Sequence, residues 1–405
     1  MNVLRVAWRN LWRNGRRTVI TLAAVAFSTA VLTITVGLMH GMIRNALRNA
    51  TNLYVGEAEI HAAKYMEEHS FYESISDAEG ILARVRGQGI DGTARSYGYG
   101  LVASGTKSAG ALFWGLNPED ERRVFDLSRY MAKGEFLDGG AKSGIVLGQK
   151  LARSLQADLG SEIVVVVEAA DGSLGNELFT VTGILKTVGE GTDRSAALLH
   201  REDFDRLFVG GGRVHELAFN TRGAVPENDL AAALEKIAPG EEVRGWRKLL
   251  PVLSDMMNMF DAILWIFGGV FFLSAGLGVL NTMLMATHER VREFGCVKAL
   301  GASPWRIIRD VAVEALVLGV ISSALGGVLG LWGCRWIERH GIDTSALAKG
   351  TQMAGIAFDP VWRAVTDPAI AFRTALVMSA VCLVASLYPA VLAARLQPVQ
   401  AMQRV

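Results

Sequence analysis

Four long apolar segments constrain the fold of this 405-residue chain more than any other feature. They occupy residues 18–43, 262–286, 311–334 and 374–394, and each exceeds 20 residues. Roughly 20 apolar residues in a helix cross a bilayer. The one carboxylate among them, Glu314, lies a turn from the start of the third segment, where it can reach interfacial water. We therefore predict four transmembrane helices, because buried core helices of a soluble protein fit neither these lengths nor this charge distribution.

The basic residues beside these segments predict their orientation. Lys and Arg gather on the cytoplasmic flanks of membrane helices. Here they precede the first segment and separate the second from the third: Arg5, Arg9, Arg13, Arg16, Arg17, Arg290, Arg292, Lys298, Arg306 and Arg309. The cytoplasmic parts are then residues 1–17, 287–310 and 395–405, and residues 44–261 and 335–373 lie on the opposite side of the membrane. We expect a multi-pass membrane protein with both termini in the cytoplasm.

Residues 1–17 show the pattern of an amphipathic helix. Leu4, Trp8, Leu11 and Trp12 share one face, while Arg5, Arg9 and Arg13 form a row spaced by four. Such a helix lies at the membrane surface in contact with lipid and braces the first span. A solvated basic tail remains an alternative. A cleaved signal peptide is disfavoured because the apolar run is too long and no small-residue cleavage pattern follows.

Residues 44–261 form a large region of mixed secondary structure. Its patterns predict strands at 59–62, 93–104, 109–116, 144–147, 163–168, 177–185 and 214–220, and helices at 77–86, 148–158 and 227–237. This order favours an α+β fold over a doubly wound sheet. The last strand and helix could pair back with the first strands and enclose the middle as an insertion. Cys296, Cys334 and Cys382 lie outside this region, so it should fold without disulfides.

The sequence offers no persuasive catalytic site. It contains no G-x-x-x-x-G-K-[ST] loop, and residues 144–150 echo that motif only superficially. His61, His69, His200 and His215 are scattered, so we expect surface or hydrogen-bonded histidines instead of metal ligands. With a net charge of +1 and no basic stripe interleaved with aromatics, nucleic-acid binding is set aside. We predict no catalytic residue, metal or cofactor in this chain, and an enzyme acting alone is disfavoured.

The short stretch between the second and third segments is the candidate functional site. Helical periodicity extends from Met283 to Leu300, with charged residues alternating with apolar ones. Gly301 can end this helix in a left-handed cap, and Ser303 with Pro304 can start the next. A solvated loop is the simpler alternative. An exposed Phe294 beside many glycines favours a docking surface.

Three motifs resemble the FtsX-like ABC transporter permeases. The most specific is R-x-x-E-F-G-x-x-K-A-L-G-A-S, which starts at Arg290 and ends at Ser303. The family's R-N-L…R-R-T entry resembles Arg9-Asn10-Leu11 through Arg16-Arg17-Thr18, and its closing motif resembles Tyr388-Pro389-Ala390 with Ala394, Arg395, Pro398 and Ala401. Together with the predicted topology, the resemblance covers the whole chain.

The resemblance implies a permease subunit of the bacterial inner membrane, with residues 44–261 and 335–373 in the periplasm. It would work with a second permease, identical or paralogous, and with a cytoplasmic ABC ATPase dimer carrying ATP and Mg²⁺. Its action would be mechanotransmission: closure of the ATPase moves the periplasmic domain. That domain would have a porter-like lobe at 57–103 plus 214–245 and a Sabre-like lobe at 104–212. The residues implied to contact the ATPase are Glu289, Arg290, Glu293, Phe294, Gly295, Lys298, Ala299, Leu300, Gly301 and Ala302.

Further segments are similar to the lipoprotein-releasing Lol permeases. They are residues 56–61 with Tyr65, residues 115–120, and residues 144–152. This similarity implies release of lipoproteins, or of another lipidated substrate, from the inner membrane, with a periplasmic carrier or adaptor as a further partner. Two alternatives remain: a MacB-like tripartite efflux permease, and a permease that signals or regulates hydrolases without transport. The large region at 44–261 disfavours the last.

Overall fold

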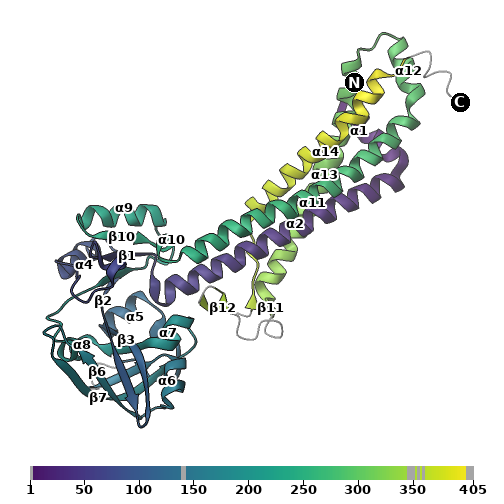
Figure 1. Cartoon of the computed structure of the whole chain (residues 1–405). Helices are drawn as coiled ribbons and strands as arrows, with labels where there is room; N and C mark the ends of the chain where they lie inside the picture. Colours follow the sequence, from purple (N-terminus) through teal and green to yellow (C-terminus); the bar gives the residue numbers. More distant parts are fainter. Residues whose placement is uncertain (1–2, 138–142, 344–351, 354–355, 358–360, 398–405) are drawn as a thin grey trace. The chain divides into compact units, whose positions relative to one another are not determined.

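The computed structural model describes residues 3–137, 143–343, 352–353, 356–357 and 361–397 (Figure 1). The chain divides into two compact units. The membrane unit contains residues 1–43, 257–347 and 360–405, and the extramembrane unit contains residues 44–256 with 348–359.

The membrane unit is helical. Its described elements are α1 (Val3–Leu11), η1 (Trp12–Asn14), α2 (Gly15–Ala50), α11 (Pro251–Glu289), α12 (Val291–Ala299), α13 (Pro304–His340) and α14 (Pro368–Arg395), with a short strand pair β11 (Ile342–Asp343) and β14 (Val361–Trp362). Within the described residues, four helices are long and apolar enough to cross a membrane: α2, α11, α13 and α14. The prediction of four spanning helices is confirmed. Each helix extends beyond its predicted apolar segment.

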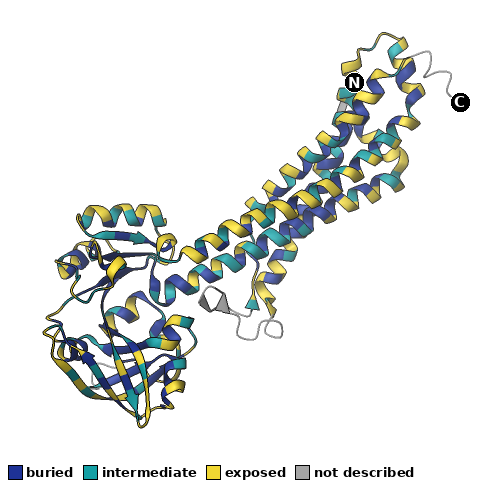
Figure 2. Cartoon of the chain, in the orientation of Figure 1, coloured by how far each residue is buried: buried dark blue, intermediate teal, exposed yellow. Residues whose placement is uncertain are grey.

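Small residues allow the spanning helices to pack closely. A Cβ at Gly326 of α13 would lie 2.3 Å from the Ala26 carbonyl oxygen of α2, and one at Gly330 would lie 2.7 Å from Thr33 Cβ. Since lipid tails supply no hydrophobic drive between helices, such close contact is a main source of their association. Ser323 and Ser379 add a hydrogen bond of 2.8 Å between α13 and α14. The same helices carry exposed residues along their length (Figure 2).

The extramembrane unit is built on one mixed sheet. Its strands are β1 (Ala58–His61), β2 (Gly92–Ser104), β3 (Lys107–Leu116), β4 (Met131–Gly134), β5 (Gly144–Leu147), β6 (Glu162–Glu168), β7 (Leu174–Leu185), β8 (Ala196–His200), β9 (Glu216–Phe219) and β10 (Glu242–Gly245). Among the described residues these ten strands pair in the order β10-β1-β9-β2-β3-β8-β5-β7-β4, with β6 against β2 and β7. A separate short pair joins β12 (Gln352–Met353) and β13 (Ile356–Ala357).

Short helices cover this sheet. They are η2 (Thr51–Val55), α3 (Tyr65–Glu68), α4 (Ala78–Arg86), α5 (Pro118–Val124), η3 (Leu127–Arg129), α6 (Gln149–Leu155), α7 (Glu190–Ser195), α8 (Arg201–Phe208), α9 (Glu227–Ile237) and α10 (Trp246–Leu249). The start of α5 shows how local chemistry fixes an element: the Asn117 side chain accepts a hydrogen bond from the Glu119 N–H, and Pro118 occupies the first turn. The predicted α+β content is confirmed.

Strand β2 connects two hydrophobic cores. Its first half pairs with β9 and places Ala94 in a core with Ile60 and Leu217. Its second half pairs with β6 and places Val102 in another core with Phe113 and Phe179. The predicted boundary between the lobes after residue 103 therefore does not separate the two cores. It leaves Val102, a residue of the second core, in the porter-like lobe. The names porter and Sabre stay predictions.

Candidate coupling site

The helix of the second span ends earlier than its periodicity predicts. We expected one helix from Met283 to Leu300, but α11 stops at Glu289 and α12 starts at Val291. Arg290 between them has φ −110° and ψ 16°, outside helical geometry. The helical periodicity did not reveal this break. Apolar residues keep the same helical spacing from α11 into α12, and the single residue between the two helices does not interrupt that spacing.

The end of α12 matches the predicted cap. The Gly301 N–H donates to the Lys298 carbonyl 2.9 Å away, and the Ala302 N–H donates to the Val297 carbonyl 3.2 Å away. This pair of bonds is a Schellman motif, and Gly301 adopts φ +89°, which a side chain would strain. Ser303 takes the N-cap position of α13, but its side chain makes no capping hydrogen bond. The turn between α12 and α13 is therefore held by backbone geometry.

The prediction that Phe294 is exposed is wrong. Only 7% of it is accessible, and it packs with Ile307 and Val311 of α13 and with Ala390 and Ala394 of α14. The face of α12 that carries Phe294 thus packs against the spanning helices, where burial of an aromatic side chain is favourable. Phe294 anchors α12 and cannot at the same time fill a groove on a partner.

Lys298 is also used inside the unit. Its ammonium donates to the carbonyl oxygens of Ala394 and Leu396, each 2.7 Å away. These carbonyls lie at the end of α14, where a cation satisfies both the unpaired acceptors and the helix dipole. Lys298 therefore ties α12 to α14. Of the closing motif, Pro398 and Ala401 lie outside the described residues.

Ion pairs connect this turn with the N-terminal segment and with α13. Arg13 contacts Glu293 at 2.5 Å, and Arg17 contacts Glu289 at 3.0 Å. Arg290 contacts both Glu293 and, at 3.0 Å, Glu314. Partial burial alone would raise the pKa of Glu293, but the hydrogen bonds from Arg13 and Arg290 hold it below its usual value. Glu314 is buried against Arg290, so the expectation that it reaches interfacial water is wrong.

Large apolar side chains stand among the charged and polar residues that this turn exposes. Leu300 is 88% accessible and Trp305, on the first turn of α13, is 71% accessible, with Val297 also exposed. Of the smaller predicted coupling residues, Ala299 and Gly301 are exposed, Ala302 is half-buried and Gly295 is buried. The accessible ridge therefore runs over Val297, Leu300 and Trp305. Trp305 was not among the predicted coupling residues, because the motif that was used to choose them ends at Ser303.

The N-terminal helix is shorter than predicted. It ends at Leu11, and Trp12 and Arg13 belong to the following 3-10 turn. Trp8 and Trp12 are both about half exposed and meet edge to face, with ring centroids 5.9 Å apart. Arg9 is exposed as well. Leu11, expected on the lipid-facing side, is instead buried in a core with residues of α2, α11, α13 and α14. The side chains of Leu4 and Arg5 lie outside the described residues.

A second cluster of functional groups, which the sequence did not reveal, lies in the extramembrane unit. Arg95 donates two hydrogen bonds to Glu121, at 2.6 and 3.2 Å, and one to Glu216 at 2.8 Å. Its guanidinium also stacks on Phe125, 4.5 Å from the ring centroid. Both carboxylates and Arg95 are buried. The opposed charges and hydrogen bonds compensate the cost of removing these ions from water.

Glu59 and His61 lie next to this network. His61 Nε2 is 2.8 Å from Glu59 Oε2. Burial and the nearby charge of Glu216 raise the pKa of Glu59 to about 7. Burial alone would lower the pKa of His61, but the hydrogen bond and charge of Glu59 raise it above its usual value.

The four histidines considered in the sequence differ in their surroundings. His69 is exposed and His200 half-buried, whereas His61 and His215 are buried. The Nδ1 of His215 accepts the Tyr97 N–H at 2.8 Å, and its Nε2 lies 2.8 Å from the Phe71 carbonyl, so both nitrogens are used. Burial lowers the pKa of His215. His215 thus behaves as the hydrogen-bonded core histidine that we predicted.

The available sequence signal for this cluster was weak. Glu59 and His61 alternate on a predicted strand and so share one face. Their partner Glu216 lies more than 150 residues away, beside a histidine that does something else. No spacing rule connects such residues before the strands are paired.

Two protein families match the chain. The MacB-like periplasmic core domain matches residues 18–237, and the FtsX-like permease C-terminal domain matches residues 265–398. Together they cover most of the membrane unit and most of the extramembrane unit.

Characterised relatives are distant. The chain is 23% identical over 330 residues to the lipoprotein-releasing system transmembrane protein LolC of Neisseria meningitidis, covering 78% of this chain and 76% of LolC. It is 24% identical over 359 residues to the pyoverdine export ATP-binding/permease protein PvdT of Pseudomonas syringae, covering 82% of this chain and 51% of PvdT. It is 24% identical over 292 residues to the macrolide export ATP-binding/permease protein MacB of Marinobacter nauticus, covering 67% of this chain and 42% of MacB.

Among solved structures, the periplasmic region of MacB from Actinobacillus actinomycetemcomitans aligns with a TM-score of 0.36 at 12% identity, covering 50% of this chain and 91% of that region. The family models span more than half of the sequence and agree with the motifs at Arg290–Ser303. The chain therefore belongs to the FtsX-like ABC transporter permeases that carry a MacB-like periplasmic core domain.

Proposed function

We propose that this permease couples a separate cytoplasmic ATPase dimer to conformational change in its periplasmic domain, and so releases lipoproteins or another lipidated substrate from the inner membrane. The ATPase would supply ATP and Mg²⁺ chemistry, and a second permease, identical or paralogous, would complete the assembly. Both termini and the α12–α13 turn would lie in the cytoplasm. A periplasmic carrier or adaptor would receive the substrate.

The proposed substrate class rests on how much of each chain the LolC alignment covers. The alignment covers about three quarters of both proteins, 78% and 76%, whereas the MacB alignment covers 42% of MacB. Similar coverage is found for LolC of Xylella fastidiosa, at 75% of each chain. At 23–24% identity, these matches support a LolC-like role as a proposal.

The α12–α13 turn supports the coupling role. It offers the exposed ridge of Val297, Leu300 and Trp305, which a groove on the ATPase can bury. A few side chains, with tryptophan prominent among them, carry most of the energy of an interface, so Trp305 is the main candidate on this ridge. Behind this ridge, Phe294 and Lys298 fix α12 to the spanning helices. A movement imposed at the ridge would therefore be transmitted to α13 and α14.

A depletion experiment tests the substrate. We expect loss of the protein to leave lipoproteins in the inner membrane, measured by fractionating the two membranes and by labelling with a radioactive fatty acid. Normal lipoprotein distribution together with sensitivity to an exported drug or peptide would reject lipoprotein release.

Purification of the intact chain in mild detergent tests the coupling surface. We expect an ABC ATPase to co-purify with the wild-type chain, and Leu300→Ala with Trp305→Ala to reduce its recovery about tenfold or more. Val328→Ala, an exposed residue within the spanning part of α13, is the matched control. Recovery of the ATPase that is unchanged by the double substitution would show that the ridge is not the docking surface.

Efflux of a secreted compound is the second candidate. The match to PvdT, which covers 82% of this chain, favours it. An adaptor protein or outer-membrane channel that co-purifies without lipoproteins would select efflux over lipoprotein release.

A further inference from the structure

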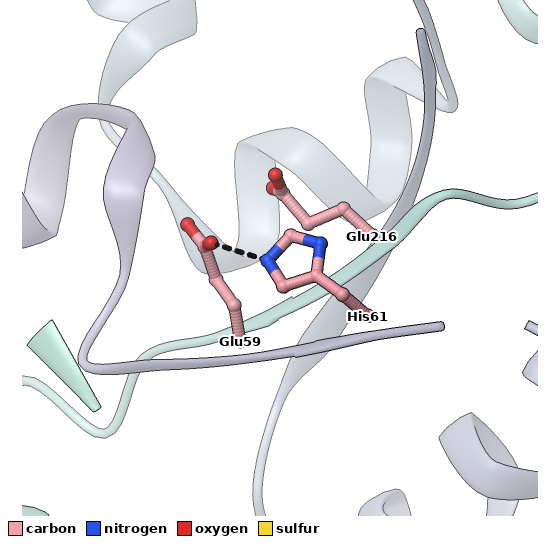
Figure 3. A group of neighbouring side chains, drawn as sticks. All are labelled: Glu59, His61 and Glu216. Carbon is pink, nitrogen blue, oxygen red and sulfur yellow. Dashed lines mark hydrogen bonds and ion pairs between the residues drawn. The ribbon is translucent and has the colours of Figure 1, made fainter. Parts of the chain in front are cut away.

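Three potential metal ligands come together on one face of the extramembrane sheet. Glu59 and His61 are two residues apart on β1, and the register of β1 with β9 places His61 directly opposite Glu216. One oxygen or nitrogen from each side chain lies within 4.8 Å of the others. Figure 3 shows the imidazole and the two carboxylates turned toward one another. All three residues are buried.

The imidazole of His61 is oriented as metal-bound histidines are. Its Nδ1 lies 3.1 Å from the His215 carbonyl oxygen. Since a carbonyl oxygen can only accept, Nδ1 carries a proton, and in the neutral ring Nε2 has the free lone pair. A backbone carbonyl that holds the far nitrogen in this way fixes the tautomer and ring orientation at metal centres. Nε2 points to Glu59.

The charges in the cluster favour a divalent cation. The contact of 2.8 Å between His61 Nε2 and Glu59 requires one proton between them, so this pair is neutral as a whole. Arg95 faces two carboxylates, Glu121 and Glu216, which leaves one negative charge without compensation in the cluster. Exchange of the shared proton for a divalent ion would add one positive charge and bring the buried cluster to neutrality. Uncompensated buried charge is costly, so neutralisation of the cluster favours binding of a divalent ion.

A cavity beside the three ligands leaves space for the ion and its water. Its volume is about 220 Å³, and Glu59, His61 and Glu216 contribute to its wall. A water molecule occupies about 30 Å³, so several fit. Two other residues of the wall, His69 and Tyr99, are exposed, which connects the cavity with solvent. An ion can therefore enter and complete its coordination with water.

We propose that Glu59, His61 and Glu216 bind a divalent transition-metal ion, and that zinc is the ion they fit best. One imidazole and two carboxylates suit zinc, whereas calcium and magnesium prefer oxygen ligands alone. Zinc sites with three protein ligands and a water molecule in the fourth position are common in proteins. The ion would stand between β1 and β9 and hold them together on the face that also carries Arg95 and Tyr97. This site is independent of the transported substrate.

Zinc binding requires side-chain shifts, because atoms that share one zinc lie closer together than the 4.8 Å within which the three ligand atoms now lie. Zinc lies about 2.0 to 2.2 Å from nitrogen and oxygen ligands. Glu59 and His61, now at hydrogen-bond distance, would separate slightly as the shared proton leaves. Glu216 would retain its hydrogen bonds from Arg95 and Tyr97, since each carboxylate oxygen has a second lone pair.

Zinc binding by the full chain tests the proposal. Tag-free protein in detergent is treated with a chelator and dialysed against buffered zinc, and the bound metal is measured by mass spectrometry. We expect about one zinc per wild-type chain. Glu59→Gln, which preserves volume and can still hydrogen bond to His61, should weaken binding about 100-fold or more, because loss of even an outer partner costs about 10- to 100-fold. His61→Ala should do the same.

Two controls locate the ion. His69→Ala removes the exposed histidine at the cavity wall, and His200→Ala removes one elsewhere in the unit. Both should bind zinc as the wild type does. Equal binding by wild type, Glu59→Gln and His61→Ala would overturn the proposal, as would an absence of stoichiometric zinc in the wild type.

A measurement on the wild type alone guards against variants that fail to fold. X-ray absorption of the zinc-loaded chain should show nitrogen and oxygen neighbours, including one imidazole, with no sulfur. A sulfur neighbour would place the ion at a cysteine, and the proposal would be wrong. Circular dichroism of each variant shows whether it retains the fold.

Discussion

The Arg95 cluster of the extramembrane unit and the N-terminal contacts of the α12–α13 turn in the membrane unit use ion pairs in opposite ways. In the extramembrane unit, Arg95 and Glu121 form a pair whose side chains are 1% and 0% accessible. In the membrane unit, Arg13 and Glu293 form a pair whose side chains are 51% and 50% accessible. A buried pair is costly to break because one ion then stays unpaired in a medium of low dielectric constant. An exposed pair exchanges its partner for water at little cost.

This difference fits the roles proposed for the two regions. The buried cluster of Arg95 holds β2, β9 and α5 in a single arrangement. The pairs of Arg13 with Glu293 and of Arg17 with Glu289 connect the N-terminal segment with α12 and α11 through more exposed contacts that can separate and reform. A turn that follows a moving partner needs contacts of the second kind. Four substitutions test this contrast, beginning with the largest expected effect.

Glu121→Ala should have the largest effect. It leaves Arg95 with Glu216 alone in a buried site, and removal of one partner of a buried pair costs about 3 to 5 kcal/mol. Hydrogen exchange of the full chain in detergent, followed by mass spectrometry, should show faster exchange in β2 and β9. Glu119→Ala on the exposed side of α5 is the control, with an expected change within about 0.5 kcal/mol. Equal exchange in both variants would remove the contrast between the units.

Phe294→Ala should destabilise the membrane unit by about 3 kcal/mol. The substitution leaves a cavity among α12, α13 and α14, where the ring is now packed. Thermal unfolding in detergent measures it. Leu300→Ala on the same turn removes a side chain that is 88% accessible and should leave stability unchanged. If Leu300→Ala were the more destabilising of the two, the assignment of anchor and docking residue would be reversed.

Glu314→Ala should cost about 1 to 3 kcal/mol, because it leaves Arg290 without its buried carboxylate partner. Glu314→Gln keeps a hydrogen-bond acceptor of the same size and should lose less. The comparison is made by thermal unfolding of both variants. Identical losses would mean that the negative charge of Glu314, and not its hydrogen bond, supports the turn.

Arg13→Gln should have the smallest effect, below about 1 kcal/mol, because the pair with Glu293 is half exposed. The effect should decrease further at high salt, which screens exposed charges. The pKa of Glu293 is depressed in the folded protein, so the pair contributes above the usual pKa of a glutamate and is lost as the pH falls through the folded value. Thermal unfolding at two salt concentrations measures the difference. A loss as large as that of Glu121→Ala would contradict the comparison.

Elements with a local signal were predicted well. The strand at 93–104 and the helix at 77–86 appear as β2 (Gly92–Ser104) and α4 (Ala78–Arg86), and Asp77 caps α4 by accepting the Gly80 N–H. The strands at 163–168 and 177–185 appear as β6 (Glu162–Glu168) and β7 (Leu174–Leu185), which pair antiparallel, and Gly172 between them has φ +79°. Alternation, capping residues and turn glycines act within a few residues, so the sequence shows them directly.

Positions that depend on distant neighbours were predicted poorly. Phe294 looked exposed because its neighbours in sequence are charged, but α13 and α14 cover it. Glu314 looked solvated because it lies near the end of a span, but Arg290 pairs with it. The cluster of Glu59, His61 and Glu216 could not be recognised at all before β1 and β9 were paired.

The sequence by itself determined the four spanning helices, the α+β region between the first two, and the family, because hydrophobic length, periodicity and short motifs are local properties. The tertiary structure alone decided which polar groups meet. Whether a carboxylate lies in water or against another charged group can depend on a residue far away in the sequence, 24 positions for Glu314 with Arg290 and 280 positions for Glu293 with Arg13. Burial and pairing set the energy of such groups, and both arise only when the elements pack.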